Sequence, residues 1–284
     1  MIEFYQLEQL VTLEKEGTLS KTAKVLNISQ PAITRSMQRL EDDLGVALFE
    51  RKKNKIVLNE NGLLAVSLAK KVLSSKDSMV ETLQAFELSK KEICIGSIAP
   101  APMWILHETL EEKYPKMKIK EDLIHSENEL LSGLESYKYP IIISMRPIRK
   151  DNYESVKLFS EQLFISLPPA HPLASYPEVS YEDINGESVL LLNDIGYWNE
   201  ITMRNIPNSH LLVQGDRSVF SELIQASALP YFRSNITLDR QPPTDNRVII
   251  PITDKDAKAT YYATYHTRDK ELFHFIKNHK FKYR

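Results

Sequence analysis

The stretch Thr18–Gly45, TLSKTAKVLNISQPAITRSMQRLEDDLG, decides the fold of the amino-terminal part of the chain. Its second half carries apolar residues at spacings of four, three and four, which mark one stripe of a helix: Ile33, Met37, Leu40 and Leu44. Ser29 stands before this helix as an N-cap, and Pro31 falls in its first turn, where a missing N–H costs nothing. The pattern predicts a helix that begins directly after Ser29.

Two further helices are expected before this one. Leu19, Ala23 and Leu26 form a smaller apolar stripe, and Asn27–Ser29 is short enough to be the turn, although it lacks the glycine often found there. A first helix over Phe4–Val11 can cover both. The sequence therefore predicts a three-helix unit with a helix-turn-helix at its centre.

The side of the third helix away from its apolar stripe carries amides and guanidinium groups: Gln30, Thr34, Arg35, Gln38 and Arg39. Such groups can form hydrogen bonds with base edges in a major groove. Between Leu19 and Leu40 every charged residue is a lysine or an arginine. We therefore expect a helix that reads DNA. The alternative is a structural three-helix module, whose charged face is only solvated.

After Gly45, the run Ala47–Leu58 looks like two short strands around a basic turn. Its cationic residues are Arg51, Lys52, Lys53 and Lys55. A hairpin with these residues near its tip suits phosphate contact or insertion into a minor groove. It would form a wing beside the third helix.

These segments together resemble the winged helix-turn-helix of LysR-type transcriptional regulators. The resemblance is carried by Phe4…Leu7, Leu19–Ala23, Ser29–Thr34, Leu40-Glu41, Leu44-Gly45, Leu48–Arg51 and Leu58…Gly62, in specific order and spacing. It implies DNA contacts at Ser29, Gln30, Pro31, Thr34, Arg35, Gln38, Arg39, Arg51 and Lys53. Lys24 and Thr34 are small departures, since the family often has alanine and serine there.

Composition agrees with a regulator inside a cell. The 284 residues are 42% hydrophobic and 26% charged, and the net charge of −2 means that DNA affinity must come from local segregation of charge. The single Cys94 lies in a strand-like run, so it is expected to be a buried small residue rather than a nucleophile, and no internal disulfide can form. No signal peptide and no bilayer-length apolar run is visible, so we expect a cytoplasmic location and no membrane partner.

Residues 59–89 contain no proline and predict one long helix. Its apolar residues recur at spacings of three, four or seven: Leu64, Leu68, Val72, Met79, Leu83 and Phe86. This stripe either packs on its own domain or pairs with a second copy, as the family's linker helix does. We favour pairing, because a two-fold dimer suits a palindromic operator.

From Lys91 onward the pattern is strand, helix, strand, helix, strand: Glu92–Ser97, Met103–Tyr114, Lys118–Ile124, Asn128–Tyr137 and Pro140–Met145. This order predicts a largely parallel sheet. The family resemblance implies a two-lobed α/β effector domain like the periplasmic binding proteins of type 2. Leu163–Ala174 would enter the second lobe, Tyr261–Tyr265 would return to the first, and Asp269–His279 would form a closing helix.

The expected fold is therefore of α+β or α/β class in three parts. Residues 1–58 form the winged helix-turn-helix, 59–89 the linker helix, and 90–284 the effector domain. Lobe I takes about 90–160 and 259–284, and lobe II about 161–258.

Ligands of open parallel sheets bind beyond the carboxyl ends of the strands and between lobes. By analogy with the family, the effector contacts expected are Ser97, Ala99, Ser126, Ser144, Arg146, Asn193 and Tyr197. Arg146 could bind a carboxylate, or form a surface ion pair. Ile224–Pro230 and Tyr139–Ile141 depart from the family pattern. We therefore expect a cleft that differs from the family's or is partly closed, and a ligand-independent regulator stays an open alternative.

No enzyme motif accompanies these features. The seven histidines are scattered without metal-ligand spacing, and no phosphate-binding loop or nucleophile elbow is present. We therefore expect no enzyme activity, no metal and no cofactor apart from a small-molecule effector. The expected partners are double-stranded DNA, further copies in a homodimer or homotetramer, and RNA polymerase. The other hypothesis is a solute-binding α/β module whose amino-terminal helices serve protein contacts.

Overall fold

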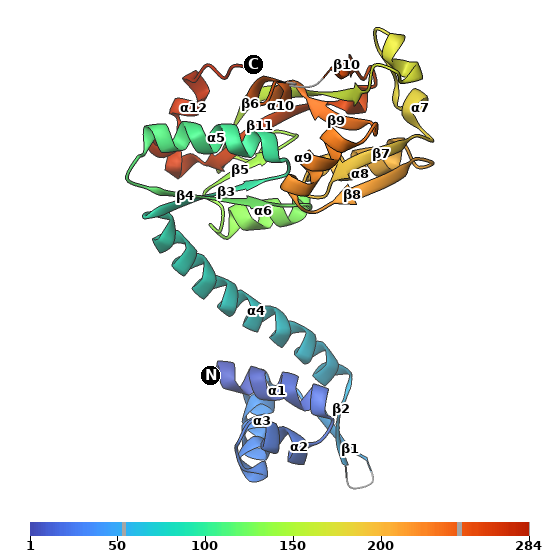
Figure 1. Cartoon of the computed structure of the whole chain (residues 1–284). Helices are drawn as coiled ribbons and strands as arrows, with labels where there is room; N and C mark the ends of the chain where they lie inside the picture. Colours follow the sequence, from blue (N-terminus) through green and yellow to red (C-terminus); the bar gives the residue numbers. More distant parts are fainter. Residues whose placement is uncertain (53–54, 243–245, 284) are drawn as a thin grey trace. The chain divides into compact units, whose positions relative to one another are not determined.

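The structure is a computed structural model that describes residues 1–52, 55–242 and 246–283, with the backbone only for residues 51, 52, 55 and 56 (Figure 1). The chain divides into two compact units, Met1–Gln84 and Ala85–Arg284. Each unit has its own hydrophobic core.

The first unit contains the predicted helices: α1 (Phe4–Glu16), α2 (Leu19–Val25) and α3 (Gln30–Leu44). An antiparallel hairpin follows, formed by β1 (Phe49–Lys52) and β2 (Lys55–Leu58). The core gathers Leu10, Leu13, Ala23, Ile33, Met37, Leu40, Leu48, Val66 and Ala69. The predicted three helices and wing are therefore confirmed. The last member of the predicted stripe, Leu44, is 39% exposed because α3 ends there.

The turn between α2 and α3 works without glycine. Asn27 takes a positive φ of 54°, a left-handed conformation that asparagine tolerates better than most residues. The Ser29 hydroxyl then accepts the N–H of Ala32 at 3.3 Å, which confirms the predicted N-cap.

The root of the wing is held from two sides. Glu41 Oε1 accepts the N–H groups of Leu48 and Phe49 at 2.7 and 3.2 Å, which ties β1 to the end of α3. The Asn59 side chain donates to the Ala47 carbonyl at 2.9 Å. Gly62 is required beside it, because a Cβ there would lie 2.2 Å from the Leu48 carbonyl oxygen.

A single long helix, α4 (Glu60–Ser89), follows the wing, as predicted. Val66 and Ala69 face the core of the first unit. The predicted apolar stripe lies elsewhere on the helix and is exposed, except for its last residue, Phe86.

The second unit begins with β3 (Glu92–Ser97), α5 (Pro100–Lys113), β4 (Lys118–Leu123), α6 (Glu127–Glu135) and β5 (Ile141–Ser144). β3 pairs in parallel with both β4 and β5, which confirms the predicted βαβαβ order. Right-handed crossovers place α5 and α6 on opposite faces of this sheet (Figure 1). The first helix starts three residues earlier than expected, because Ala99 is its N-cap and Pro100 opens its first turn.

The sheet as a whole is mixed rather than largely parallel. Its order is β4-β3-β5-β11-β6-β9-β7-β8, with β10 also on β6. The long strand β6 (Tyr153–Leu167) pairs antiparallel with β11 (Lys258–His266) through Gln162, and its last residues pair with β9 (Tyr231–Ser234) and β10 (Val248–Pro251). β6 thus joins lobe I, built around β3, β5 and β11, to lobe II.

Lobe II contains β7 (Ser188–Leu192), α8 (Tyr197–Asn205), β8 (His210–Gln214), α9 (Arg217–Ala226) and α10 (Asn235–Arg240). β7 pairs in parallel with β8 and β9. The short elements of this part are η1 (Pro172–Ser175), α7 (Tyr181–Ile184) and η2 (Lys255–Ala257).

The prediction of a single closing helix over Asp269–His279 is wrong. Three short elements replace it: η3 (Thr267–Asp269), α11 (Lys270–Phe273) and α12 (Phe275–Asn278). The break falls at His274, whose carbonyl accepts the N–H of Lys277, three residues on, at 3.1 Å. That bond replaces the i to i−4 pattern of an α-helix.

Candidate functional site

The outer face of α3 is a row of exposed polar side chains. Ser29, Gln30, Pro31, Thr34, Arg35, Gln38 and Arg39 are all exposed. The Ser29 hydroxyl caps the helix, and Thr34 Oγ1 donates to the Gln30 carbonyl at 3.0 Å. In the part of the chain that the structure describes, neither Arg35 nor Arg39 forms an ion pair, so both guanidinium groups can bind an external partner.

The wing carries two of the predicted DNA contacts, Arg51 and Lys53, and the structure describes only the first of them. Arg51 lies in β1 opposite Ile56. Lys53 lies outside the described residues. Its assignment therefore stays a prediction from the sequence.

The predicted stripe of α4 forms an exposed apolar surface, which we call the α4 stripe. It consists of Leu64, Leu68, Val72, Met79 and Leu83, which are 46% to 61% exposed. Monomers seldom leave a row of large apolar side chains uncovered, and such a row marks an interaction surface.

Within the second unit, the end of α4 contributes to a cluster that the sequence did not indicate. The guanidinium carbon of Arg268 lies 3.8 Å from the ring centre of Tyr137 and 4.3 Å from that of Phe86. The two rings also meet edge to face. Phe86, the last apolar residue of the predicted stripe, therefore packs here and is only half exposed.

The turns that open α5 and α8 meet between the lobes. The N–H of Tyr197 donates to the carbonyl of Ile98 at 2.9 Å. Gly196 makes this approach possible, since a Cβ there would lie 2.3 Å from the Ile98 oxygen, and its φ of 59° is costly for other residues. The cleft is closed at this point.

Two hydroxyls expected to hold an effector are engaged in their own turns. Ser97 Oγ donates to the Ala99 carbonyl at 2.7 Å, and Ser144 Oγ donates to the Arg146 carbonyl at 2.8 Å. Both serines are buried. Their geometry explains the turns at the ends of β3 and β5 without a ligand.

The other expected contacts lie at exposed turns or helix ends. Ser126 is the N-cap of α6, and its hydroxyl accepts the N–H of Glu129 at 3.5 Å. Asn193 is exposed and donates its N–H to the Gln214 carbonyl at 2.8 Å. Arg146 is exposed as well. None of the seven expected effector contacts lines the cavity described next.

A cavity of about 430 Å³ lies between α5 of lobe I and the strands and helices of lobe II. Its apolar wall includes Leu163, Leu190, Leu192, Ile195, Phe220 and Phe232. Its polar groups include Glu161, Thr202, Arg217, Arg233 and Ser234. The volume and the mixture of an apolar wall with a few polar groups are typical of small-ligand sites.

Glu161 is the most unusual group of this cavity. The carboxyl is 3% exposed, and its Oε2 accepts from Trp198 Nε1 at 3.0 Å and from the Tyr261 hydroxyl at 2.7 Å. Burial raises the pKa of Glu161, and hydrogen bonds from Ser234, Tyr261 and Trp198 oppose that rise. Among the described residues no lysine or arginine forms an ion pair with it.

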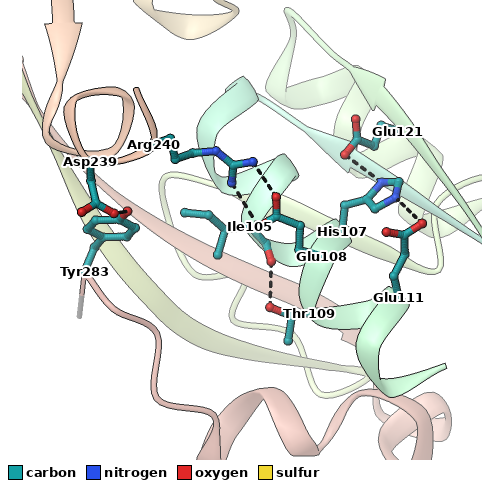
Figure 2. Close-up of polar contacts among 9 residues, drawn as sticks. All are labelled: Ile105, His107, Glu108, Thr109, Glu111, Glu121, Asp239, Arg240 and Tyr283. Atoms are coloured by element: carbon teal, nitrogen blue, oxygen red, sulfur yellow. Dashed lines mark hydrogen bonds and ion pairs between the residues drawn. The ribbon is translucent and has the colours of Figure 1, made fainter. Parts of the chain in front are cut away.

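An ion pair links α10 to α5 beside the cavity. Two nitrogens of the Arg240 guanidinium donate to the Glu108 carboxylate of α5, one of them at 3.1 Å (Figure 2). Arg217 and Arg240 also lie over the ring of Trp104, at 4.8 and 5.8 Å from its centre. Figure 2 shows His107 on the same helix between Glu111 and Glu121, at 3.2 and 2.8 Å, which ties α5 to β4.

The sequence reasoning missed Glu161, although a signal for it exists. In β6 the inward positions alternate, and Phe159, Leu163 and Ile165 are all buried. Glu161 occupies the same phase of the strand. An acid in the apolar phase of a strand indicates a buried carboxyl.

Two negative findings concern the described residues. No helix among them is both long and apolar enough to cross a membrane. No cluster of three histidine, cysteine, aspartate or glutamate side chains suited to a metal ion occurs in the part of the chain that the structure covers.

Two family models match the chain. The model for the bacterial regulatory helix-turn-helix protein of the lysR family covers residues 4–63, and the model for the LysR substrate binding domain covers residues 89–275. The boundary between them falls within α4.

Curated relatives agree with these matches. The HTH-type transcriptional regulator YybE of Bacillus subtilis (strain 168) is 30% identical over 207 residues, which cover 71% of this chain and 70% of the relative. A hydrogen peroxide-inducible genes activator of Dickeya chrysanthemi is 29% identical over 194 residues, which cover 66% of this chain and 63% of that protein. The alignments thus span about two thirds of the relatives' length.

Solved structures share the fold. Vibrio fischeri DarR in complex with DNA superposes with a TM-score of 0.59 at 17% identity, covering 98% of this chain and 99% of that one. A full-length OxyR variant from Pseudomonas aeruginosa superposes with a TM-score of 0.52 at 20% identity, covering 98% and 94%.

Proposed function

This chain belongs to the LysR family of bacterial regulatory helix-turn-helix proteins and is a DNA-binding transcriptional regulator; from that premise we propose which residues bind DNA and what controls them. The observation that carries the proposal is the exposed polar row on α3, in which Arg35 and Arg39 form no ion pair with any described residue. Arg35, Gln38 and Gln30 read base edges in the major groove. Ser29, Pro31, Thr34 and Arg39 set the position of the helix on the duplex, and Arg51 and Lys53 of the wing contact phosphates.

Self-association supplies the second recognition helix. The α4 stripe pairs with the same stripe of another copy, so residues 59–89 act as the dimerisation helix between the DNA-binding part (1–58) and the effector domain (90–284). A two-fold dimer presents two α3 helices to successive turns of a palindromic operator. The structure of DarR is that of a complex with DNA, which supports DNA binding by this chain as well. Association of effector domains into a homotetramer and contact with RNA polymerase in the bacterial cytoplasm extend this proposal.

The cavity between the lobes is the effector site in this proposal. A ligand there touches α5 of lobe I and α8 and α9 of lobe II, so its binding depends on how the lobes are closed. It controls DNA binding only if it favours one arrangement of the assembled subunits over another. The contact between Tyr197 and Ile98 marks a closed state of the two lobes within one subunit.

A thiol sensor is not favoured, although several relatives are named hydrogen peroxide-inducible genes activators. This chain has one cysteine, so it cannot form an internal disulfide. Burial raises the pKa of Cys94 to about 11, which disfavours the reactive thiolate. A bound small molecule is therefore the better signal.

The experiment is a titration of the purified full chain with fluorescent duplexes at several salt concentrations. Each phosphate neutralised should lower the logarithm of affinity by roughly 0.9 per tenfold rise in salt. Affinity that does not depend on salt would favour a solute-binding module whose amino-terminal helices serve protein contacts. Tight and specific DNA binding that no metabolite alters would favour a ligand-independent regulator.

A further inference from the structure

We propose that the cavity between the lobes takes a small apolar amine, whose ammonium group pairs with the buried carboxyl of Glu161. The inference rests on the proposed function, in which this cavity is the effector site. It names the chemical class of the effector, which neither the family nor the fold supplies.

The first observation is the isolation of the Glu161 carboxyl. It lines the cavity and is 3% exposed, and its neighbours are the hydrogen-bond donors Trp198, Tyr261 and Ser234. No described cation pairs with it. A buried carboxylate without a positive partner is costly, and a cationic ligand would remove that cost.

A second unsatisfied group lines the same cavity. Thr202 is 1% exposed, and its Oγ1 has no hydrogen-bond partner among the described residues. Buried hydroxyls are rarely left unpaired. The hydroxyl can accept from a ligand, and an ammonium has three donors to offer.

An aromatic ring stands beside the carboxyl. Trp198 lines the cavity, and its Nε1 is 3.0 Å from Glu161 Oε2. Because Nε1 lies at the edge of the ring, the indole holds the carboxyl in place by a hydrogen bond. The carboxyl itself is the group that favours a positive ligand over a negative one.

Of the two arginines that line the cavity, one is held by carbonyl groups and the other is exposed. Arg233 donates to the carbonyls of Thr237 and Gln241, and Arg217 is exposed and lies over Trp104. At the start of α5, Pro100 and Pro102 have no N–H, which removes two of the amides that bind anions at a helix N-terminus. A carboxylate placed near Glu161 would also be repelled.

The rest of the cavity selects an apolar body. Leu163, Leu190, Ile195, Phe220 and Phe232 supply most of the wall. Burial of apolar ligand surface against such a wall supplies affinity, whereas the polar end fixes orientation. An aromatic or branched aliphatic amine meets both requirements.

The test compares three probes of one shape: phenethylamine, phenethyl alcohol and phenylacetate. Binding to the purified full chain is followed by calorimetry and by tryptophan fluorescence. We expect phenethylamine to bind at least about tenfold more tightly than the alcohol, because hydrogen bonds to charged groups are the stronger ones. Phenylacetate should bind most weakly of the three.

Two substitutions at the cavity and one control locate the effect. Glu161→Gln should weaken phenethylamine binding at least about tenfold and leave the alcohol nearly unchanged. Thr202→Val should weaken the amine by a smaller factor. Glu222→Gln on the exposed side of α9 should change nothing. Circular dichroism and thermal melts of each variant verify that it is folded.

Three results would overturn the assignment. One is phenylacetate binding as tightly as the amine, which would assign the cavity to acids held by Arg217 or Arg233. Another is equal binding of all three probes, or no binding of any of them at concentrations up to about 10 mM. The third is amine binding that Glu161→Gln leaves unchanged. DNA affinity measured on the same samples keeps this failure distinct from failure of the proposed function, which would appear as loss of sequence preference in the wild-type chain.

Discussion

The backbone N–H of Tyr197 and the carbonyl of Ile98 form a 2.9 Å hydrogen bond that joins the two lobes of the effector unit. It lies where the turn before α8 meets the turn before α5. Gly196 lies at the contact, with its Cα facing the same carbonyl. Closure of the lobes thus depends on one residue without a side chain.

Gly196→Ala should open this contact. The new Cβ would lie 2.3 Å from the Ile98 oxygen, and the φ of 59° would be strained. We expect the free energy of unfolding to fall by about 1–3 kcal/mol. The melting temperature, measured by differential scanning calorimetry, should fall by about 3–10 °C.

Gly215→Ala is the matched control, since a Cβ there meets no described atom within 4 Å and its φ lies outside the left-handed region. Equal melting temperatures for the two variants would show that the contact does not hold the lobes together.

Glu161 should make stability depend on pH. Burial raises the pKa of this carboxyl above the ordinary value of 4.5, so between these two pKa values the folded chain binds more protons than the unfolded chain does. The contribution of Glu161 to the stability of the fold is therefore greatest at low pH. It falls as the pH rises from about 4.5 through the raised pKa of the folded state. Each tenfold difference in proton affinity corresponds to about 1.4 kcal/mol.

Glu161→Gln should lack this fall. The measurement is the difference in melting temperature between wild type and variant as a function of pH, with Glu222→Gln as control. A difference that is flat across that window would mean that the carboxyl titrates as it does in water.

Leu68→Glu should dissociate the dimer. Leu68 is 51% exposed in the protomer, so the substitution should leave the fold intact while it places an unpaired carboxylate in the paired α4 stripe. The cost of about 3 kcal/mol or more would weaken association by roughly a hundredfold. Sedimentation velocity at micromolar concentration measures it.

Ser74→Glu is the control, because it adds the same charge to α4 on a side that the α4 stripe does not occupy. A Leu68→Glu variant that associates as wild type does would remove the α4 stripe from the interface.

The helices of the first unit could be predicted because periodicity decides them. The stripe of α3 and the length of α4 follow from the spacing of apolar residues, and Ser29 marks the start of α3. The turn at Asn27 was expected despite its missing glycine, and the left-handed φ of asparagine explains why it works.

The effector site could not be predicted in the same way. The hydroxyls of Ser97 and Ser144 suit a ligand and a turn equally well in the sequence, whereas in the fold each donates to a carbonyl of its own turn. The first ten residues of β6 are rich in polar side chains, so their pairing with β11 depends on strands distant in sequence. Glu161 was overlooked because its donors come from Trp198 and Tyr261, far along the chain.

The most direct measurement of the central proposal is the binding of wild type, Arg35→Ala and Lys53→Ala to a duplex selected from a random pool and to its single-base variants. We expect the wild type to prefer the selected duplex over random DNA. Arg35→Ala should lose about 1–3 kcal/mol together with discrimination at one base position, whereas Lys53→Ala should weaken all duplexes alike. A wild type without preference, or an Arg35→Ala variant that weakens every duplex equally, would contradict base reading by α3.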